Sequence, residues 1–468
     1  MKRSFLILSL ILFTFLIGEA VYSQQIEGRW YGTLSVQNAK LRISFNIQKS
    51  DTLYKGTMDS PDQNISGIPI DFVSYSNSVL KIVNSTLNIE YNGIHAGDKI
   101  LGTFRQSGLS LQLNLSRHIP EGLRRPQEPA LPLPYISEEI LFINKDDSIV
   151  LSGTLTKPDK PGVHDAVILI NGSGPQNRDS EIMGHKPFLV LSDMLTKRGI
   201  AVLRYDERGV GMSGGDYSKS NTLDLARDVK WALEYLKSRT DIGKVGLIGH
   251  SEGGIIAPIV AANSDMVSFL VLLAAPGMKG RDIIMEQQEL ISLAGGASRE
   301  DIEAYRSINT KIFDLIEKDG DNPDSLRLKI SKILKENTRG ELTNNQIKQQ
   351  VNGLLTPWML FFLNYDPIPV LSDIKCPVLA LNGKKDLQVS YKSNLYHIHR
   401  ALTGESRIDN NIVTHSNNHV KTVVFEDLNH LFQCSKSGHP NEYSTIEETI
   451  NISVVETIID WINEIRRN

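Results

Sequence analysis

Five prolines between residues 119 and 136 divide the sequence into two parts with different hydrophobic patterns. Proline fixes the backbone φ and has no amide hydrogen, so a run of this kind disfavours both helix and sheet. The chain of 468 residues is also longer than one ordinary domain, and two domains are therefore expected. We predict a stiff linker over residues 119–136, which contains Pro120, Pro126, Pro129, Pro132 and Pro134.

The segment before the linker, residues 24–118, contains short runs in which apolar and polar residues alternate. Leu41–Ile47 and Leu109–Leu115 are clear examples. Alternation with a period of two places apolar side chains on one face of a strand, and the Asn, Asp and Gly residues between the runs favour turns. We predict an all-β domain of about seven or eight strands, folded as a small barrel or sandwich.

After the linker, near-continuous apolar runs alternate with amphipathic stretches. Such runs are typical of strands that helices cover on both faces, so residues 137–468 are expected to form a doubly wound, mostly parallel sheet. The strand rhythm stops between about residues 278 and 366, which predicts a helical cap inserted after the sixth strand. The expected strands are Ile140–Ile143, Ile149–Thr156, Ala166–Ile170, Ala201–Tyr205, Val245–Ile248, Phe269–Ala274, Val378–Leu381 and Val420–Phe425, and the expected covering helices are Phe188–Arg198, Thr222–Lys237 and Ile446–Ile465.

The first residues have the pattern of an export signal. Lys2 and Arg3 precede an apolar run, Phe5–Ile17, and small residues follow near Ser23. An uncleaved membrane anchor is the alternative, but the run is shorter than the roughly 20 residues that span a bilayer. We therefore predict that residues 1–23 are a removed signal peptide, that the mature protein has no stable membrane span, and that it is periplasmic or extracellular.

Charge and cysteine content limit the partners and the stabilising chemistry. The formal net charge of -4 provides no basic surface for a polyanion, so nucleic acid is not expected as a partner. Cys376 and Cys434 are the only cysteines, which excludes a disulfide-rich scaffold. Two buried thiols are the preferred interpretation, and a single bridge stays open because only geometry decides it.

Gly249-His250-Ser251-Glu252-Gly253 carries the strongest chemical signal in the sequence. A serine hydroxyl becomes a useful nucleophile only when it is held exposed beside a base. The predicted strand before this run and the helical sequence after it place Ser251 in a sharp strand-to-helix turn, where the flanking glycines allow close backbone packing. We predict that Ser251 is a catalytic nucleophile; a purely structural glycine-rich turn is the alternative.

An acid and a base are expected after the seventh and eighth strands of such a sheet. Asp386 follows the strand that ends near Gly383, and His430 lies in the loop after Val420–Phe425. These positions give the chain order Ser, Asp, His. We therefore predict Asp386 as the orienting acid and His430 as the base. His439 is the reserve base, and His415 and His419 are more simply solvated loop residues, since two imidazoles alone are a weak metal signal.

The oxyanion of an acyl-transfer intermediate requires backbone donors. One is the NH of Glu252, the residue after the nucleophile. The second is expected from the glycine-rich loop after the third strand of the sheet, where glycines let the backbone approach a substrate. We predict the NH of Ser173, with Gly174 as the alternative.

Several motifs together resemble bacterial α/β-hydrolases of the carboxylesterase type, near the serine aminopeptidase (S33) and acyl thioesterase branches. The resemblance covers about residues 137–468. It implies a triad of Ser251, Asp386 and His430, no cofactor, and hydrolysis of short acyl esters through an acyl-enzyme. The motifs are residues 171–179, 206–213, 249–254, 383–389 and 429–433.

Charged residues in these motifs have simpler structural interpretations. Arg178 and Asp179 are expected to form a loop-fixing ion pair, and the same is expected of Asp206 and Arg208. Glu252 departs from the small or apolar residue that often follows the nucleophile. Its carboxylate is expected either to orient a cap residue or to face solvent.

The substrate is the least determined property. Trp358, Phe361 and Phe362 are candidate walls of an apolar acyl pocket, although aromatic residues at this spacing are more often core. A small-molecule acyl ester is the expected substrate; aminopeptidase and acyl thioesterase activities are alternatives, and the oligomeric state stays open. A further alternative is a glycan- or lipid-binding protein with an auxiliary hydrolase, in which Trp30 and Tyr31 contact the ligand rather than form barrel core.

Overall fold

A computed structural model describes most of the chain. The described residues are 26–36, 39–50, 53–63, 65–106, 108–118, 125–319, 322–337, 342–404 and 420–467. The proposed signal peptide therefore lies outside the described residues, as do His415 and His419. The chain divides into two compact units, of which one contains most of the N-terminal β-structure and the other contains residues 121–468.

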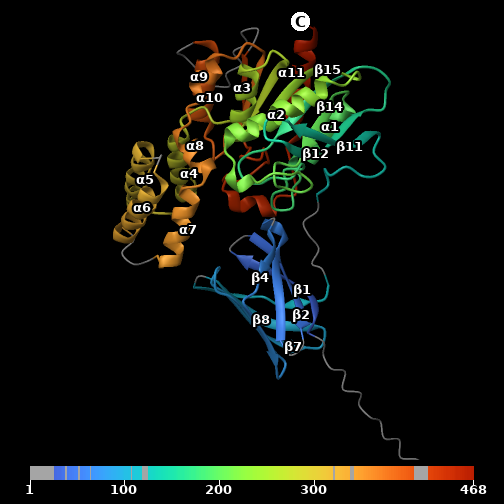
Figure 1. Ribbon diagram of the computed structural model, residues 1–468. Coiled ribbons are helices and arrows are strands. Elements are labelled where there is room, and N and C mark those ends of the chain that lie inside the picture. The colour runs from blue at the N-terminus through green and yellow to red at the C-terminus, as the bar shows by residue number, and fades with distance from the viewer. Residues whose placement is uncertain are drawn as a thin grey trace, which may run out of the picture. The chain divides into compact units, whose positions relative to one another are not determined.

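The N-terminal strands form a closed antiparallel barrel. The ring follows the order β1-β2-β3-β5-β6-β7-β8-β10 and closes through pairing of β10 with β1 (Figure 1). Closure satisfies the edge hydrogen bonds that an open sheet would expose. The strands are β1 (Gly28–Val36), β2 (Ala39–Ser50), β3 (Leu53–Ser60), β4 (Ile65–Pro69), β5 (Phe72–Ser76), β6 (Val79–Asn84), β7 (Ile89–Ala96), β8 (Lys99–Gln106), β9 (Leu109–Gln112) and β10 (Leu115–Ser116).

The described residues of this domain form ten strands rather than the expected seven or eight, and eight of the ten make up the ring. The strands outside the ring are β4 and β9, and β9 is separate because the run Leu109–Leu115 divides. Its first part, β9, pairs with one end of β8, whereas β10 pairs with the other end of β8 and with β1. The interior is filled by side chains. Trp30 is only 1% exposed and donates its indole NH to the carbonyl of Ile26, so it is barrel core. Other fully buried side chains are Phe45, Ile47, Leu80, Ile82, Tyr91, Ile100, Leu113 and Leu115.

The second unit contains an eight-stranded mixed sheet with the order β11-β12-β14-β13-β15-β16-β17-β18. The first two strands are antiparallel to their neighbours and the others are parallel, as the sequence predicts. This order is that of the α/β-hydrolase fold. The strands are β11 (Tyr135–Asn144), β12 (Ile149–Pro158), β13 (His164–Ile170), β14 (Ala201–Tyr205), β15 (Ile242–His250), β16 (Val267–Leu273), β17 (Val378–Gly383) and β18 (Val420–Phe425).

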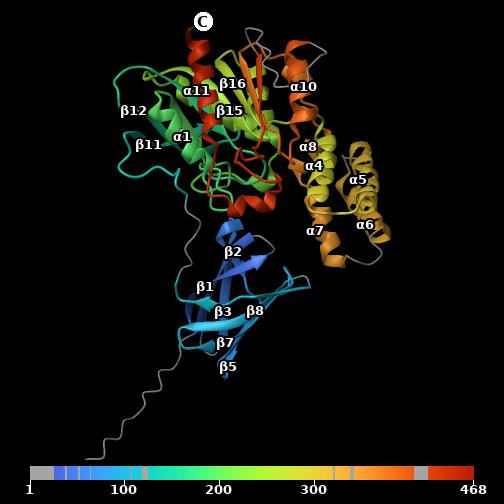
Figure 2. The same ribbon diagram turned by 180° about the vertical axis from the view of Figure 1, so that it is seen from behind.

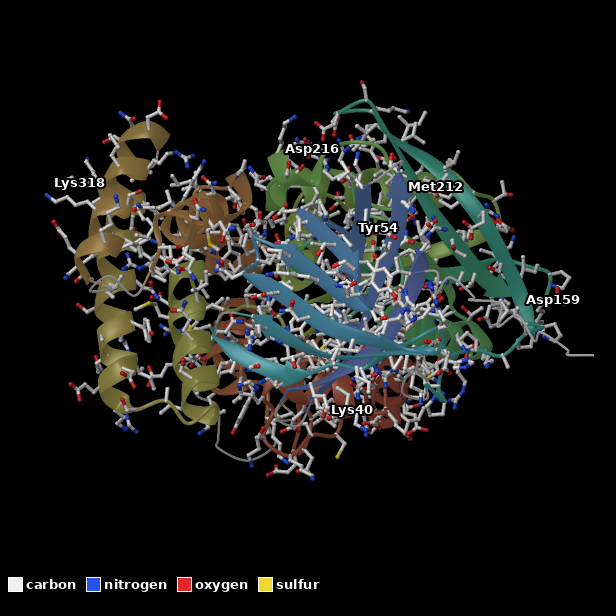
Figure 3. All side chains as sticks on the ribbon, turned by 90° about the horizontal axis from the view of Figure 1, so that it is seen from below. Lys40, Tyr54, Asp159, Met212, Asp216 and Lys318 are labelled. Atoms are coloured by element: carbon white, nitrogen blue, oxygen red, sulfur yellow. The ribbon has the colours of Figure 1, made fainter. Side chains whose placement is uncertain are left out.

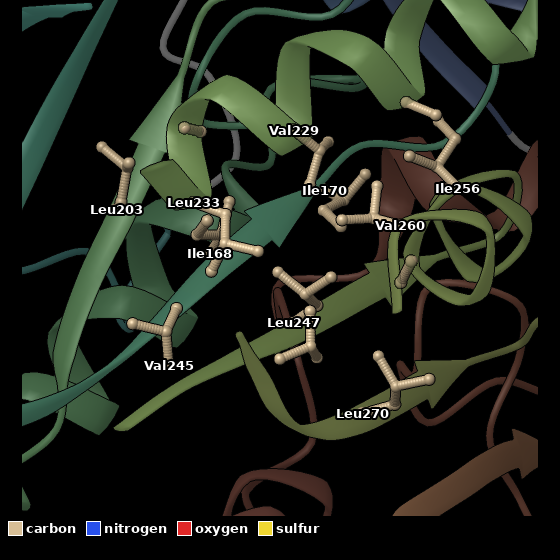
Figure 4. Close-up of a cluster of buried hydrophobic side chains, with 14 of the residues drawn as sticks. Ile168, Ile170, Leu203, Val229, Leu233, Val245, Leu247, Ile256, Val260 and Leu270 are labelled. Carbon is tan, nitrogen blue, oxygen red and sulfur yellow. The ribbon is translucent and has the colours of Figure 1, made fainter. Parts of the chain in front are cut away.

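Helices cover both faces of this sheet. The helices α1 (Pro187–Lys197) and α11 (Ile452–Arg467) pack on one face, whereas α2 (Thr222–Lys237), α3 (Gly253–Ala262) and α10 (Tyr391–Thr403) pack on the other (Figures 1 and 2). Figure 4 shows part of the apolar core between the sheet and helices α2 and α3. Leu247 of β15 lies there among apolar side chains of neighbouring strands and helices. The central strands are apolar on both faces because both faces are buried.

Part of the predicted linker is held by hydrogen bonds, and the last helix begins later than expected. Arg125 donates hydrogen bonds to the carbonyls of Met183, Gly184 and Ile446, so this part of the linker packs against the rest of the second unit. Arg125 and Gln127 hold residues 446–450 through hydrogen bonds to Ile446, Thr449 and Ile450, and helix α11 starts at Ile452 rather than at Ile446.

The chain between β16 and β17 forms the helical cap that the sequence predicts. Helices α4 (Gly280–Ala294) and α8 (Pro357–Asn364) lie nearer the sheet than α5 (Arg299–Asp319) and α6 (Pro323–Asn337) (Figure 1). The cap has a separate apolar core, which also includes α7 (Asn344–Leu354). Its outer surface is charged, and Figure 3 shows Lys318 at the exposed end of α5. The short helix α9 (Ile368–Ser372) returns the chain to the sheet.

A matched pair of leucine substitutions tests this assignment of the core. Leu247 is fully buried, whereas Leu328 in α6 is 75% exposed. We expect Leu247→Ala to lower the free energy of unfolding by about 2–5 kcal/mol, because it removes buried apolar surface and leaves a cavity. Leu328→Ala should change it by less than about 0.5 kcal/mol. Urea unfolding followed by circular dichroism measures both; equal midpoints for the two variants would contradict the packing.

Candidate active site

Ser251 lies in the turn between β15 and α3 with a left-handed backbone conformation, φ 52°. The neighbouring glycines make this turn possible. A Cβ on Gly249 would lie 2.0 Å from the carbonyl oxygen of Gly253, and a Cβ on Gly253 would lie 2.3 Å from that of Ile170. A Cβ on Gly172 would lie 3.1 Å from the Cβ of Ser251. The backbone packing thus accounts for the glycines of the motif and holds Ser251 at the end of β15.

Ser251 lines a cavity of about 440 Å³, a size suited to a small organic ligand. Trp358 and Phe362 of the predicted pocket also line it, and their rings stack with centroids 5.1 Å apart. Phe361 is not a lining residue; it stacks on Tyr365, because consecutive helix residues point about 100° apart. The remaining lining residues are Ser173, Glu252, Pro276, Ile283, Ile284, Gln287, Gln288, Ile291, Ser292, Met359, Gln388 and Val389.

Asp386 and His430, which are 44 positions apart in the sequence, are brought into contact. The Nδ1 of His430 lies 2.8 Å from Oδ2 of Asp386. The other oxygen, Oδ1, accepts hydrogen bonds from the backbone NH groups of Gln388 (2.8 Å) and Val389 (2.9 Å). A carboxylate held in this way can fix both the orientation and the tautomer of an imidazole.

Two side chains that the sequence analysis did not single out hold the loop around His430. The Oδ1 of Asn429 accepts the backbone NH groups of Leu431 (3.0 Å) and Gln433 (2.9 Å). His250 donates its Nε2 hydrogen to the carbonyl of His430 at 2.9 Å. Burial lowers the pKa of His250 to about 3, so this histidine stays neutral and serves as a donor. Both residues belong to the motifs at 249–254 and 429–433 and lie next to Ser251 and His430 in the sequence, and this was the available signal.

The remaining histidine candidate lies in a structural position. His439 is the N-cap of a short 3₁₀ helix, where its Nδ1 accepts the NH of Asn441 at 3.1 Å. Within the described ranges, the hydroxyl of Ser251 makes no hydrogen bond to another residue of the chain. Catalytic hydrogen bonds are often long in the absence of substrate and tighten when it binds.

The predicted oxyanion donors differ in their availability. Ser173 lines the cavity with Ser251 and Glu252. The NH of Gly174, the alternative donor, is already hydrogen-bonded to the Tyr217 hydroxyl at 2.9 Å. Among the described residues, no acceptor satisfies the backbone NH of Ser173 or of Glu252. The geometry therefore favours Ser173 over Gly174 as a partner for the NH of Glu252.

An ion pair between two loops positions the segment that carries Ser173. The Arg178 guanidinium donates to both oxygens of Asp206, at 3.1 and 2.8 Å, and the backbone NH of Arg178 also donates to this carboxylate. The same guanidinium contacts Thr154 and Ser152 on β12. The Arg178 charge and these hydrogen bonds hold the pKa of the Asp206 carboxyl below its usual range in spite of burial.

The expected pairs of sequence neighbours are therefore wrong. Asp179 pairs with Arg204, and Arg208 pairs with the buried Asp228 at 2.7 Å. Arg178 pairs instead with Asp206, so each pair joins residues on different loops or elements. The partner of each charged group is therefore set by the tertiary fold and not by proximity in the sequence.

Glu252 is buried beside Ser251 and is 2% exposed. Its Oε1 accepts two hydrogen bonds, from Thr222 Oγ1 and from Trp358 Nε1, both at 2.7 Å. Among the described residues, none provides a hydrogen-bond partner for Oε2. Burial raises the pKa of the Glu252 carboxyl to about 7. Of the two expectations for this residue, exposure to solvent is wrong, and the carboxyl group contacts the cap residue Trp358.

Both cysteines are free thiols, and Cys434 is exposed rather than buried. Its backbone NH is hydrogen-bonded to Glu448, and its side chain faces outward from a loop. Within the part of the chain that the structure describes, His, Cys, Asp and Glu side chains do not cluster in a way that could hold a metal ion. None of the described helices combines the length and the apolar character that crossing a bilayer requires.

The sheet order and the turn at Ser251 define the class of protein as an α/β-hydrolase. Residues 187–307 match the family described as serine aminopeptidase, S33. Esterase EstD of Thermotoga maritima is 25% identical over 323 residues, which are 69% of this chain and 68% of that protein.

Two solved structures of esterases also align with this chain. The esterase Pf2001 of Pyrococcus furiosus aligns over 74% of this chain and 99% of its own, with 13% identity and a TM-score of 0.43. The esterase EaEST of Exiguobacterium antarcticum aligns over 69% of this chain and 98% of its own, with 18% identity and a TM-score of 0.39.

The raised pKa of Glu252 has a testable consequence for stability. The folded-state pKa of about 7 lies above the ordinary value of 4.5, so wild-type stability falls as pH rises between these values. Glu252→Gln removes this titration. We expect the stability of the variant relative to wild type to increase by up to about 3 kcal/mol from pH 5 to pH 8. Thermal melts across this range measure the difference; a pH-independent difference would contradict the raised pKa.

Proposed function

We propose that this protein is a serine carboxylesterase that cleaves short acyl esters. The observation that carries the proposal is Ser251, held in a strained turn on the wall of a 440 Å³ cavity in the same fold unit as the His430–Asp386 pair. The cavity wall combines apolar side chains with serine and glutamine side chains, and Glu252 is its one acidic residue among those described, which suits an uncharged acyl ester. The similarity to Esterase EstD supports the same class of reaction.

In the proposed mechanism, His430 accepts the proton of Ser251 as the hydroxyl attacks the ester carbonyl. Asp386 holds the imidazole in the required tautomer and stabilises its cation. The tetrahedral intermediate collapses to an acyl-enzyme when the alcohol leaves with a proton from His430. Water, activated by the same imidazole, then releases the acid and restores Ser251.

The backbone NH groups of Ser173 and Glu252 are the proposed oxyanion donors. The NH of Glu252 precedes helix α3, where the positive end of the helix dipole also favours negative charge. The loop of Ser173 is held by Arg178 and Asp206, so its donor needs little reorganisation during the reaction.

Aminopeptidase activity is the second candidate because of the match over residues 187–307. It requires an ionised acceptor for a substrate ammonium group. Glu252 is the acidic residue among the described lining residues, and its Oε1 already accepts from Thr222 and Trp358. Burial also favours its neutral form by raising its pKa to about 7. These features favour an ester over an aminoacyl substrate.

Substitution of the proposed triad tests this function on p-nitrophenyl acetate, butyrate and octanoate. We expect Ser251→Ala to abolish fluorophosphonate labelling and nearly all hydrolysis, and Asp386→Asn to lower kcat by roughly 10⁴-fold because the imidazole loses its orienting acceptor. His439→Ala is the control and should stay active. Retained labelling of Ser251→Ala would overturn the mechanism, and a clear preference of wild type for an aminoacyl p-nitroanilide would favour the peptidase.

Export is also proposed, from the basic start and apolar run of residues 1–23. Expression of the full chain in a Gram-negative host should yield a mature protein that begins near Gln24 in the periplasmic fraction, because a signal peptidase removes the leader. Mass spectrometry of the intact protein measures this end. A cytosolic product that retains the complete leader would refute export, and a variant with Lys2 and Arg3 changed to Glu serves as the control.

A further inference from the structure

Three separate elements meet at one oxygen of Glu252. The residue immediately follows Ser251 and precedes helix α3. Thr222, at the start of α2, and Trp358, in cap helix α8, both donate to Oε1. Helix α8 begins here because Thr356 caps it and Pro357 occupies its first turn. The hydrogen bond to Trp358 therefore joins the cap to the residue next to the nucleophile.

The side chain held by this hydrogen bond is part of the cavity wall. Trp358 lines the cavity together with Ser251, and its ring is stacked on Phe362, also in α8. Phe362 packs with Ile255 of α3 and Ile283 of α4 in a small apolar cluster. Apolar packing alone is not directional, whereas an indole NH has a single donor direction. The Glu252 carboxylate thus determines how the indole is turned on this wall.

We propose that Glu252 is a positioning residue that fixes the Trp358 indole as a wall of the cavity and thereby limits the length of the acyl group that the site accepts. The inference rests on the proposed esterase function and deepens it. A carboxyl group buried with one oxygen unpartnered is costly, and packing alone would be served equally well by an apolar residue. The retained carboxyl group is accounted for by its hydrogen bond to the cap.

The two hydrogen bonds on Oε1 also define the conservative substitution. A glutamine carbonyl can accept from both Thr222 and Trp358, and its NH₂ group takes the place of Oε2. Glu207 and Tyr217 are titratable groups near Glu252; burial is the main cause of their raised pKa values, and the charge of Glu252 adds to it. The hydrogen bond from Trp358 to Glu252 is called the tether below. Glu252→Gln keeps this tether while it removes one ionisable group from this buried set of side chains.

The test measures kcat and KM of each variant on p-nitrophenyl acetate, butyrate and octanoate. Glu252→Ala and Trp358→Phe each remove the tether, and Trp358→Phe retains most of the aromatic surface. We expect both to raise the ratio of kcat/KM for octanoate to that for acetate by roughly tenfold or more. Glu252→Gln should retain the wild-type ratio. Thr222→Val, which removes the other donor but leaves the cap contact, should retain it as well.

The double variant Glu252→Ala/Trp358→Phe distinguishes the tether from two independent effects. Its ratio should equal that of either single variant, because both substitutions break the same hydrogen bond. A wild-type ratio in Glu252→Ala, or multiplied effects in the double variant, would overturn the inference, and thermal melts confirm that each variant is folded. Failure of the esterase proposal is recognised separately, by wild type that hydrolyses none of the esters or by Ser251→Ala that remains active.

Discussion

Close backbone packing at the Ser251 turn is the constraint on which the rest of the site depends. In the sheet, Gly249 of β15 is in register with Ile170 of β13 and Leu272 of β16. The carboxyl ends of these three parallel strands therefore meet beside Gly253, whose missing Cβ leaves room for the Ile170 carbonyl. The loop of Ser173 leaves from one neighbouring strand and the cap from the other. A larger residue at Gly253 would separate Ser251 from both.

Features with a local origin could be read from the sequence. Apolar runs identified every strand of the catalytic sheet, and the glycine spacing around Ser251 indicated a strand-to-helix turn. Position in the chain was sufficient to select Asp386 and His430, which the structure brings to 2.8 Å. Each of these inferences uses only the spacing of residues in the sequence or the order of elements along the chain. Neither property depends on which distant residues come into contact in the folded protein.

Features that depend on the choice of a distant partner could not be predicted. Arg178 has an acidic neighbour in Asp179, yet its guanidinium turns to Asp206, which is presented by another loop. Phe361 and Phe362 are identical neighbouring side chains in α8, but of the two only Phe362 lines the cavity. The difference arises because packing against α3 and α4 sets the rotation of the helix about its axis. The division of Leu109–Leu115 into two strands likewise depends on barrel closure.

Two buried carboxyl groups near the site show how different environments assign different roles. Asp386 accepts two backbone NH groups and faces His430, so both of its oxygens are engaged and its position is rigid. Glu252 concentrates its partners on one oxygen, and one of these partners belongs to the cap. A carboxylate with both oxygens engaged suits the proposed orientation of a base, whereas a carboxyl group with one oxygen engaged suits the proposed link between two parts of the fold. The hydrogen bonds of these groups, rather than their distance from Ser251, are what distinguish the two proposed roles.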